Sequence, residues 1–176
     1  MITYERASEL MTYNPGTGDV RWRSTSCEVG VRRKGGEVVG CADHRGALSY
    51  RRVAIDGRRY YAHQLAWLLL YREWPASGID HVNNDGLDNR SANLRLACQT
   101  LNNANARRRK DNSSGHRGVS FYKAYGKWEA YINSGGKRVR LGYFDSRDDA
   151  IAAYQKAAQQ TFGAYAKGSD GLAALR

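Results

Sequence analysis

The segment from Ile79 to Ala106, IDHVNNDGLDNRSANLRLACQTLNNANA, concentrates carboxylate, imidazole and amide side chains. An adjacent pair, Asp80 and His81, is followed by Asn93 and Asn102. Carboxylate and amide oxygens suit a hard cation such as Mg²⁺, so Asp80 and Asn102 are predicted to bind one divalent metal. A neutral histidine can take a proton from an attacking water, which is the role predicted for His81, and Asn93 is placed to fix its ring tautomer. Together these residue types predict metal-assisted hydrolysis of a phosphodiester bond.

Each of these residues also has an ordinary structural explanation. Asparagine and aspartate are common in turns, and NNDGLDN reads as a turn-rich loop that lacks the spacing and terminal glutamate of an EF-hand. A single histidine or asparagine is more often structural than catalytic, so the prediction rests on the whole set. Side chains alternate along a strand, so Asp80 and His81 need a strand end or a distortion to reach one substrate.

A short hairpin and a helix are expected to position this set. Residues 78–82 and 94–97 are predicted to be strands on either side of the loop, and residues 99–108 have a composition compatible with a helix. A hairpin packed against that helix would bring Asp80, His81 and Asn102 together.

The chain before this hairpin is predicted to be rich in strands. Asp56-Gly57, between LSYRRVAI and RRYYAH, is a strong signal for a two-residue hairpin turn. A helix is expected from His63 to Glu73, and Trp74-Pro75 ends it because the residue before a proline disfavours the helical region.

The last third of the chain has a different pattern. After a basic linker at 107–115, three strand candidates precede a helix that Ser146 can cap and Gly163 ends. One face of this predicted sheet is apolar and packs under the helix: Val119, Phe121, Trp128, Ala130, Ile132, Val139 and Leu141. The other face is basic with interspersed aromatic side chains: Arg117, Lys127, Tyr131, Asn133, Arg138 and Arg140. A basic ribbon of this kind can enter the DNA major groove, where arginine reads guanine edges; the alternative is a solvated strand face.

Composition supports a polyanionic partner. The 176 residues carry a formal net charge of +11 at pH 7, and the pI is about 9.8, which points first to nucleic acid. The three cysteines form no CxxC or CxxH pair, so a structural zinc site and a disulfide framework are not expected. The N-terminus is too polar for a signal peptide and no apolar run is long enough to span a membrane, so we expect a cytoplasmic protein without a membrane partner.

Residues Tyr60 to Arg107 resemble the HNH homing-endonuclease family of bacteriophages and mobile introns. The resemblance rests on AHQLAW, the Asp-His pair, the NLR segment and an N-x-x-N helix. It implies a ββα-metal nuclease site in which His81 is the general base, Asn93 orients it, and Asp80 and Asn102 bind the metal. It also implies 3′-hydroxyl and 5′-phosphate products. Asparagine at the last family position makes Mg²⁺ or Mn²⁺ the expected ion rather than zinc, and the alternatives for another register are Asn103 and Asn89.

Residues Gly115 to about Lys167 resemble the plant ethylene-response-factor (Apetala) DNA-binding domain. The matching segments are RGV, GKW, RVRLG, FD and an alanine-rich helix. The resemblance implies a three-stranded sheet in the major groove, with contact candidates at Arg117, Tyr125, Tyr131, Asn133, Arg138 and Arg140. The sequence departs from the plant pattern at several of these positions, so the plant target sequence is not transferred.

The predicted fold is α+β, a ββα-metal nuclease domain plus a small three-stranded antiparallel sheet packed on one helix. The predicted parts are residues 1–59 (β-rich), 60–106 (nuclease core), 107–115 (basic linker) and 116–170 (DNA-binding domain). The expected function is a metal-dependent endonuclease that acts on double-stranded DNA as a monomer or homodimer. The basic side chains expected to contact DNA include Arg107, Arg108, Arg109, Lys110 and Lys127. The rival hypotheses are a non-catalytic DNA-binding regulator, an RNA-binding or RNA-cleaving module and, with least support, a virion structural protein.

Overall fold

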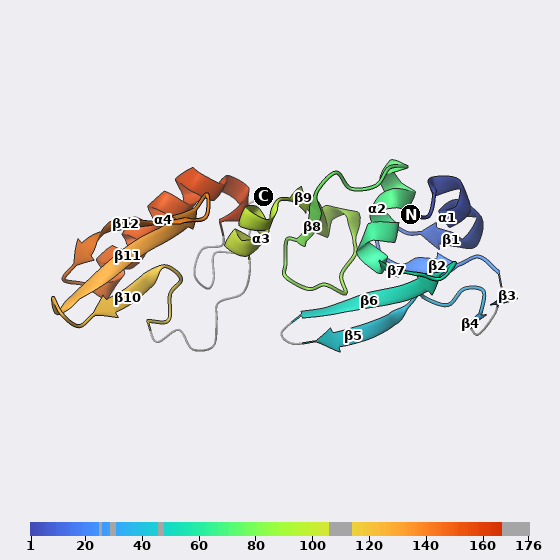
Figure 1. The fold of residues 1–176 in the computed structure, drawn as a ribbon, viewed down its shortest axis with the longest axis horizontal. Helices are drawn as coiled ribbons and strands as arrows, with labels where there is room; N and C mark the ends of the chain where they lie inside the picture. Colours follow the sequence, from blue (N-terminus) through green and yellow to red (C-terminus); the bar gives the residue numbers. More distant parts are fainter. Residues whose placement is uncertain (25, 29–30, 46–47, 106–113, 167–176) are drawn as a thin grey trace. The chain divides into compact units, whose positions relative to one another are not determined.

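The computed structural model describes residues 1–24, 26–28, 31–45, 48–105 and 114–166 (Figure 1). Within them the protein is a mixed α/β structure of small antiparallel sheets and four α-helices, which confirms the predicted class at that level. The chain divides into two compact units, Met1–Ala97 and Cys98–Arg176. The division falls inside the segment predicted as the nuclease core.

The first unit is built from short strands around two helices. Its strands pair as β1–β2, β3–β4, β5–β6–β7 and β8–β9. The elements are α1 (Tyr4–Leu10), β1 (Met11–Tyr13), β2 (Val20–Trp22), β3 (Ser26–Glu28), β4 (Val31–Arg33), β5 (Cys41–Arg45), β6 (Leu48–Ile55), β7 (Arg58–Tyr61), α2 (Ala62–Tyr71), β8 (Gly78–His81), a 3₁₀ turn at Ser91–Asn93 and β9 (Leu94–Ala97).

Two local predictions in this unit have different outcomes. The Asp56-Gly57 hairpin is confirmed, since β6 and β7 pair across it and both residues have positive φ (48° and 74°), as a type I′ turn requires. The predicted end of the following helix is wrong. The helix ends at Tyr71 because Arg72 takes a left-handed conformation (φ 62°) and donates its N–H to the Leu68 carbonyl, before Pro75 is reached.

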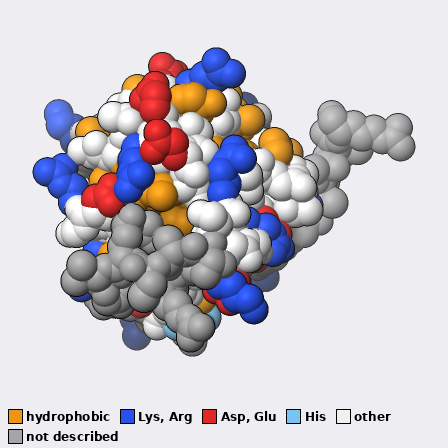
Figure 2. Space-filling view, turned by 90° about the vertical axis from the view of Figure 1, so that its right-hand side faces the viewer, with side chains coloured by type: hydrophobic (Ala, Val, Ile, Leu, Met, Phe, Trp, Pro, Cys, Tyr) orange, Lys and Arg blue, Asp and Glu red, His pale blue; other side chains and the backbone are white. Residues whose placement is uncertain are grey.

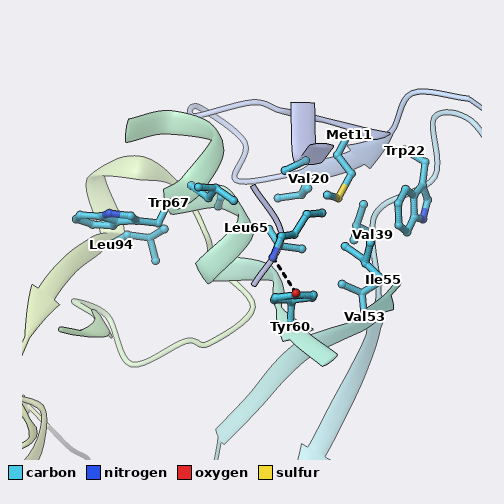
Figure 3. Packing of buried hydrophobic residues seen from close by; sticks show 14 residues of the cluster. Met11, Val20, Trp22, Val39, Val53, Ile55, Tyr60, Leu65, Trp67 and Leu94 are labelled. Carbon is cyan, nitrogen blue, oxygen red and sulfur yellow. Dashed lines mark hydrogen bonds between the residues drawn. The ribbon is translucent and has the colours of Figure 1, made fainter. Parts of the chain in front are cut away.

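The core of the first unit joins the N-terminal segment to the helix α2 (Figure 3). Met11, Ile55, Leu65 and Leu68 are fully buried within it. Tyr60 binds the N-terminal segment, since its hydroxyl accepts the backbone N–H of Ile2 at 2.9 Å. Residues 1–59 are therefore part of the same folded unit as the β8–β9 hairpin.

The surface of the molecule seen in Figure 2 carries both signs of charge. Lys and Arg side chains lie there between acidic and apolar ones instead of forming one continuous basic patch. The net positive charge by itself therefore does not locate a nucleic-acid site on this face.

The second unit is a three-stranded antiparallel sheet with a helix on one face. The predicted strands and helix are confirmed: the strand order is β10–β11–β12, and the helix α4 packs against all three strands. Ser146 caps α4 by accepting the N–H of Asp148. The elements are α3 (Gln99–Asn105), β10 (Val119–Tyr122), β11 (Lys127–Ser134), β12 (Lys137–Phe144), α4 (Arg147–Phe162) and a 3₁₀ turn at Gly163–Tyr165.

The apolar face predicted for this sheet is confirmed at its centre and wrong at its margin. Val119, Ala130 and Ile132 are buried under α4, with Trp128 and Leu141 partly buried beside them. Phe121 and Val139 were expected in the same layer but are about half exposed. A register shift between Ala130 and Tyr131 accompanies this departure from simple alternation. No helix in the ranges given above is long and apolar enough to cross a membrane.

Candidate active site

Asp80 and His81 end the strand β8, opposite β9. Asp80 is paired with Arg95 and His81 with Leu94 in the antiparallel register. Both side chains are buried, at 8% and 5% exposure for the whole residues. Two adjacent ionisable side chains in this setting need polar partners, because burial without them is costly.

The partner of Asp80 is the arginine across the strand pair. Arg95 donates to Asp80 Oδ2 from Nε at 2.9 Å and from Nη2 at 2.7 Å. The Asp80 side chain is 9% exposed and that of Arg95 19%. The carboxylate is therefore held inside the fold by two hydrogen bonds to one guanidinium.

The partner of His81 comes from the loop between the two strands. His81 Nε2 lies 3.1 Å from Asn89 Oδ1, and Asn89 is itself buried. An amide oxygen only accepts, so Nε2 carries the proton, and this tautomer leaves the basic lone pair on Nδ1. Burial lowers the pKa of His81 below its usual 6.5, against the opposing effects of the Asn89 bond and of Asp80, Asp85 and Asp88. The ring is therefore held neutral at pH 7.

Aromatic side chains surround the other faces of His81. The ring of His63 meets it edge-on at 5.2 Å between centroids, and that of Tyr50 lies 5.8 Å away. Burial, and secondarily the neighbouring His81, lower the pKa of His63 to about 3. His63 is therefore a second neutral imidazole in van der Waals reach of the first, held by α2 and packed between Tyr50 and Tyr61.

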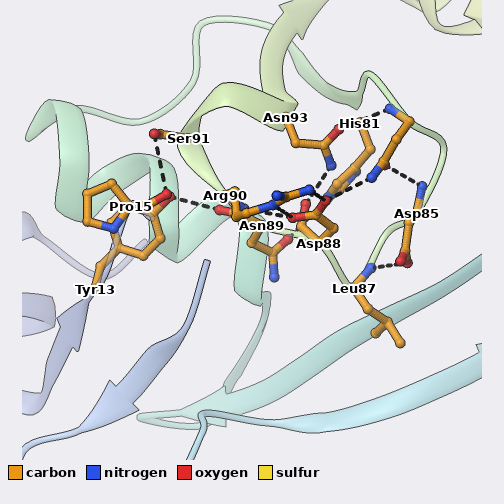
Figure 4. A network of polar contacts seen from close by, with 11 residues as sticks. Tyr13, Pro15, His81, Asp85, Leu87, Asp88, Asn89, Arg90, Ser91 and Asn93 are labelled. Atoms are coloured by element: carbon orange, nitrogen blue, oxygen red, sulfur yellow. Dashed lines mark hydrogen bonds and ion pairs between the residues drawn. The ribbon is translucent and has the colours of Figure 1, made fainter. Parts of the chain in front are cut away.

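Asn93 holds the loop in which Asn89 lies (Figure 4). Its Oδ1 accepts the backbone N–H of Asn83 at 3.0 Å, and its Nδ2 donates to the Asp88 carbonyl at 2.7 Å. The Arg90 guanidinium binds Asp88 in the same loop and lowers the pKa of that carboxyl to about 2. The loop is thus tied at both ends by side chains of its own sequence.

The N-terminal segment braces the same loop from outside (Figure 4). The Tyr13 hydroxyl donates to the Asn89 carbonyl at 2.8 Å, and burial raises its pKa to about 12, so it stays protonated. The Pro15 carbonyl accepts the Ser91 N–H at 3.0 Å. Gly18 (φ +81°) lies so close that a Cβ there would meet the Arg90 nitrogen at 2.5 Å. These contacts tie residues 13–18 to the partner of His81.

Replacing Tyr13 with phenylalanine is expected to lower the free energy of unfolding by about 1 kcal/mol, because the Asn89 carbonyl loses a buried donor. If Asn89 positions His81, the same change should slow any hydrolysis that uses His81 without weakening DNA binding. Urea unfolding and single-turnover cutting measure the two effects. Tyr4→Phe is the matched control, since within the described residues its hydroxyl makes no hydrogen bond. Equal effects of the two changes would contradict the claim that the Tyr13 hydroxyl stabilises the loop through Asn89.

The second unit presents a polar sheet face opposite α4. Tyr131, Asn133, Arg138 and Arg140 lie on it in two cross-strand pairs, Tyr131 with Arg140 and Asn133 with Arg138. Tyr125 is exposed at its edge, against Tyr122 and Tyr143. Lys127 forms an exposed ion pair with Asp145.

Two residues of the second unit differ from the sequence interpretation of this face. Arg117 was expected on the basic face, but its guanidinium donates to the Ala104 carbonyl of α3 and hydrogen-bonds Tyr154 of α4, which places it on the helix side. Glu129, which was assigned to neither face, is buried between Arg138 and Arg140. The basic linker residues Arg107, Arg108, Arg109 and Lys110 lie outside the described residues.

Comparison with known proteins assigns the chain to a family. Residues 60–104 match the family model described as HNH endonuclease. Protein 3.8 of Escherichia phage T7 is 31% identical over 91 residues, which cover 51% of this chain and 73% of the phage protein. The chain belongs to the protein 3.8 family and contains an HNH endonuclease domain.

The other matches are short. APETALA2-like protein 2 of Oryza sativa subsp. japonica and the AP2-like ethylene-responsive transcription factor TOE2 of Arabidopsis thaliana are each 50% identical over 46 residues, 26% of this chain. The chain spans only about a tenth of these plant proteins (11% and 10%). No solved structure matches the chain.

The residues matched by the HNH model include Asp80 and Asn102, the two donors predicted for a metal. Asn102 Oδ1 is buried and, among the described residues, has no hydrogen-bond partner, as an amide oxygen reserved for an ion would. Asp80 supplies a buried carboxylate. The described ranges hold no cluster of three or more His, Cys, Asp or Glu side chains suited to a metal.

The predicted HNH residues thus do not all lie on the same element. Asp80, His81 and Asn93 lie together at the β8–β9 hairpin, while Asn102 belongs to the helix of the second unit. The amide that meets the His81 ring is Asn89, which was only an alternative in the sequence interpretation. Arg95 and Tyr13 were missed; the strand register of the structure places Arg95 opposite Asp80.

The neutral His63 makes the stability of the HNH domain depend on pH. Its pKa is about 3 when folded and near 6.5 when unfolded, so the unfolded chain binds more protons between these values. The free energy of unfolding therefore has its full value above pH 6.5 and falls as the pH drops toward 3. The expected loss is about 2 kcal/mol between pH 7 and pH 5. Urea unfolding at several pH values should show this slope, and His63→Leu should flatten it; an unchanged slope would mean that His63 titrates normally.

Proposed function

We propose that this protein is a metal-dependent endonuclease that hydrolyses a phosphodiester bond of double-stranded DNA. The observation that carries the proposal is the neutral, buried His81, held in one tautomer by Asn89 beside the carboxylate of Asp80, in an HNH endonuclease domain. A neutral imidazole of lowered pKa can accept a proton at pH 7, which is what a general base must do.

In the proposed reaction, the His81 Nδ1 lone pair takes a proton from a water molecule as its oxygen attacks the scissile phosphorus. The new P–O bond forms as the bond to the 3′ oxygen breaks. That oxygen takes up a proton from solvent, leaving a 3′-hydroxyl and a 5′-phosphate. His81 keeps its Nε2 proton throughout and donates it to Asn89 Oδ1, which stabilises the imidazolium that forms.

Asp80 and Asn102 are the residues that would hold the divalent ion, Mg²⁺ or Mn²⁺. When bound, such an ion stabilises negative charge on the phosphate and on the leaving oxygen. The Arg95 guanidinium binds Asp80 and orients that carboxylate inside the fold. Asn93 contributes by fixing the loop backbone around Asn83 and Asp88.

The second unit is proposed to bind the DNA duplex through its polar sheet face. Arginines on a strand can reach guanine edges in the major groove, and neighbouring polar and aromatic side chains contribute phosphate and base contacts. The proposed contact residues are Tyr125, Lys127, Tyr131, Asn133, Arg138 and Arg140, with the linker residues Arg107, Arg108, Arg109 and Lys110 as phosphate contacts.

The experiment is a cutting assay on supercoiled plasmid and on phage and host genomic DNA, with Mg²⁺, with Mn²⁺ and with EDTA. We expect metal-dependent conversion to open circle if one strand is cut, or to linear DNA if both are. Intact DNA in every metal, together with tight duplex binding, would instead favour the non-catalytic regulator. Preference for RNA over duplex DNA in competition would favour an RNA-directed role.

A further inference from the structure

Glu129 is a buried carboxylate at the centre of the polar sheet face of the second unit. The residue is 5% exposed although it lies on the side of the sheet away from α4. Arg138 Nη2 binds its Oε2 at 2.7 Å, and Arg140 Nε binds its Oε1 at 2.9 Å. Each carboxylate oxygen therefore holds a different arginine.

The two arginines are fixed on a second side by tyrosine rings. Arg138 Cζ lies 3.5 Å from the ring centroid of Tyr131, and Arg140 Cζ lies 5.1 Å from that of Tyr143. A free arginine samples many rotamers and loses that freedom when it binds a ligand. Here a carboxylate and a ring have already restricted each guanidinium before any partner arrives.

The arginines nevertheless keep donors for a partner. Their side chains remain 52% (Arg138) and 60% (Arg140) exposed. Arg140 uses Nε for Glu129, and within the described part of the chain its two Nη groups make no hydrogen bond. Paired N–H groups of a guanidinium match the O6 and N7 acceptors of guanine.

We propose that Glu129 is a positioning residue that orients Arg138 and Arg140 to read guanine at two nearby positions of duplex DNA. The inference rests on the proposed duplex binding by this unit and adds the base that it recognises. The two arginines are two residues apart on β12, about 6.6 Å along the strand, close to two base steps of a DNA strand at about 6.8 Å.

A carboxylate that only balanced charge would have the opposite effect on binding. Removing one negative charge from a basic face strengthens contact with phosphates for any sequence. If Glu129 positions the arginines, its removal instead lowers the preference for guanine while binding to unrelated DNA stays equal or becomes tighter. Base preference therefore separates positioning from electrostatics.

The test is selection of binding sites from random duplexes by the full chain in EDTA, which withholds metal and so prevents cutting. We expect the wild type to select guanine at two positions, and Glu129→Gln to reduce the specific-to-nonspecific affinity ratio by about 10-fold or more. Asp149→Asn is the matched control, because it removes one exposed acid from α4 on the opposite side of the sheet. It should keep the wild-type preference.

Two further variants keep the proposal testable if Glu129→Gln does not fold. Arg138→Lys and Arg140→Lys retain the charge but lose the planar fork, so each should relax one guanine position. Unchanged preference in a folded Glu129→Gln variant, or in both lysine variants, would overturn the proposal. Wild-type binding without any base preference would overturn it and leave the nuclease intact, whereas no duplex binding at all would also remove the proposed function of this unit.

Discussion

Replacing His81 with alanine is expected to slow DNA cutting by about 10²–10⁴-fold while duplex binding stays unchanged. The reason is that His81 is the buried, neutral imidazole whose tautomer is fixed by Asn89. Its removal takes away the proposed proton acceptor but none of the basic side chains that are proposed to contact DNA. Single-turnover cutting and an equilibrium binding assay measure the two effects on the same duplex.

His44→Ala is the matched control for this change. His44 is an exposed histidine on β5 that binds only the Ser49 hydroxyl among the contacts of the described residues. We expect this variant to cut at the wild-type rate. Equal losses in the two variants would show that the His81 effect is not specific to its position.

Replacing Asp80 with alanine should abolish cutting and also destabilise the fold. The Arg95 guanidinium would be left partly buried without its carboxylate, at a cost of about 3 kcal/mol. Loss of the proposed metal ligand would remove catalysis independently of that cost. Urea unfolding and metal titration of cutting, at a temperature where the variant stays folded, measure the two consequences.

Arg95→Met separates the two roles of Asp80. It breaks the same ion pair and should cost comparable stability, yet it leaves the carboxylate available for an ion. We therefore expect it to retain metal-dependent cutting well above the level of Asp80→Ala. If both variants lose cutting equally when folded, Arg95 takes part in the reaction itself and the assignment of Asp80 alone is incomplete.

Local signals in the sequence were enough for most elements that carry the site. The turn-rich loop NNDGLD between two candidate strands predicted the β8–β9 hairpin, and Asp56-Gly57 predicted the turn between β6 and β7. Both depend on turn chemistry, which is a property of a few neighbouring residues. The helix end at Tyr71 was missed because a left-handed arginine has no distinctive sequence signal.

The contacts that complete the site could not be predicted in this way. Tyr13 hydrogen-bonds Asn89, which lies 76 positions later in the sequence, and nothing in the local sequence of either residue indicates this contact. Glu129 was missed because an isolated acid among basic residues reads as an ordinary solvated charge, whereas the sheet register brings two arginines over it. Such partners are determined by tertiary packing and not by residue type.

The most direct test of the central claim, that the His81 imidazole takes the proton in DNA cutting, is chemical rescue. Wild type, His81→Ala and Asp80→Ala would be compared in single-turnover cutting with Mg²⁺, with and without added imidazole. We expect wild-type cutting, a strong loss in His81→Ala that imidazole partly restores, and no restoration in Asp80→Ala. Cutting by His81→Ala at the wild-type rate without imidazole would contradict the claim.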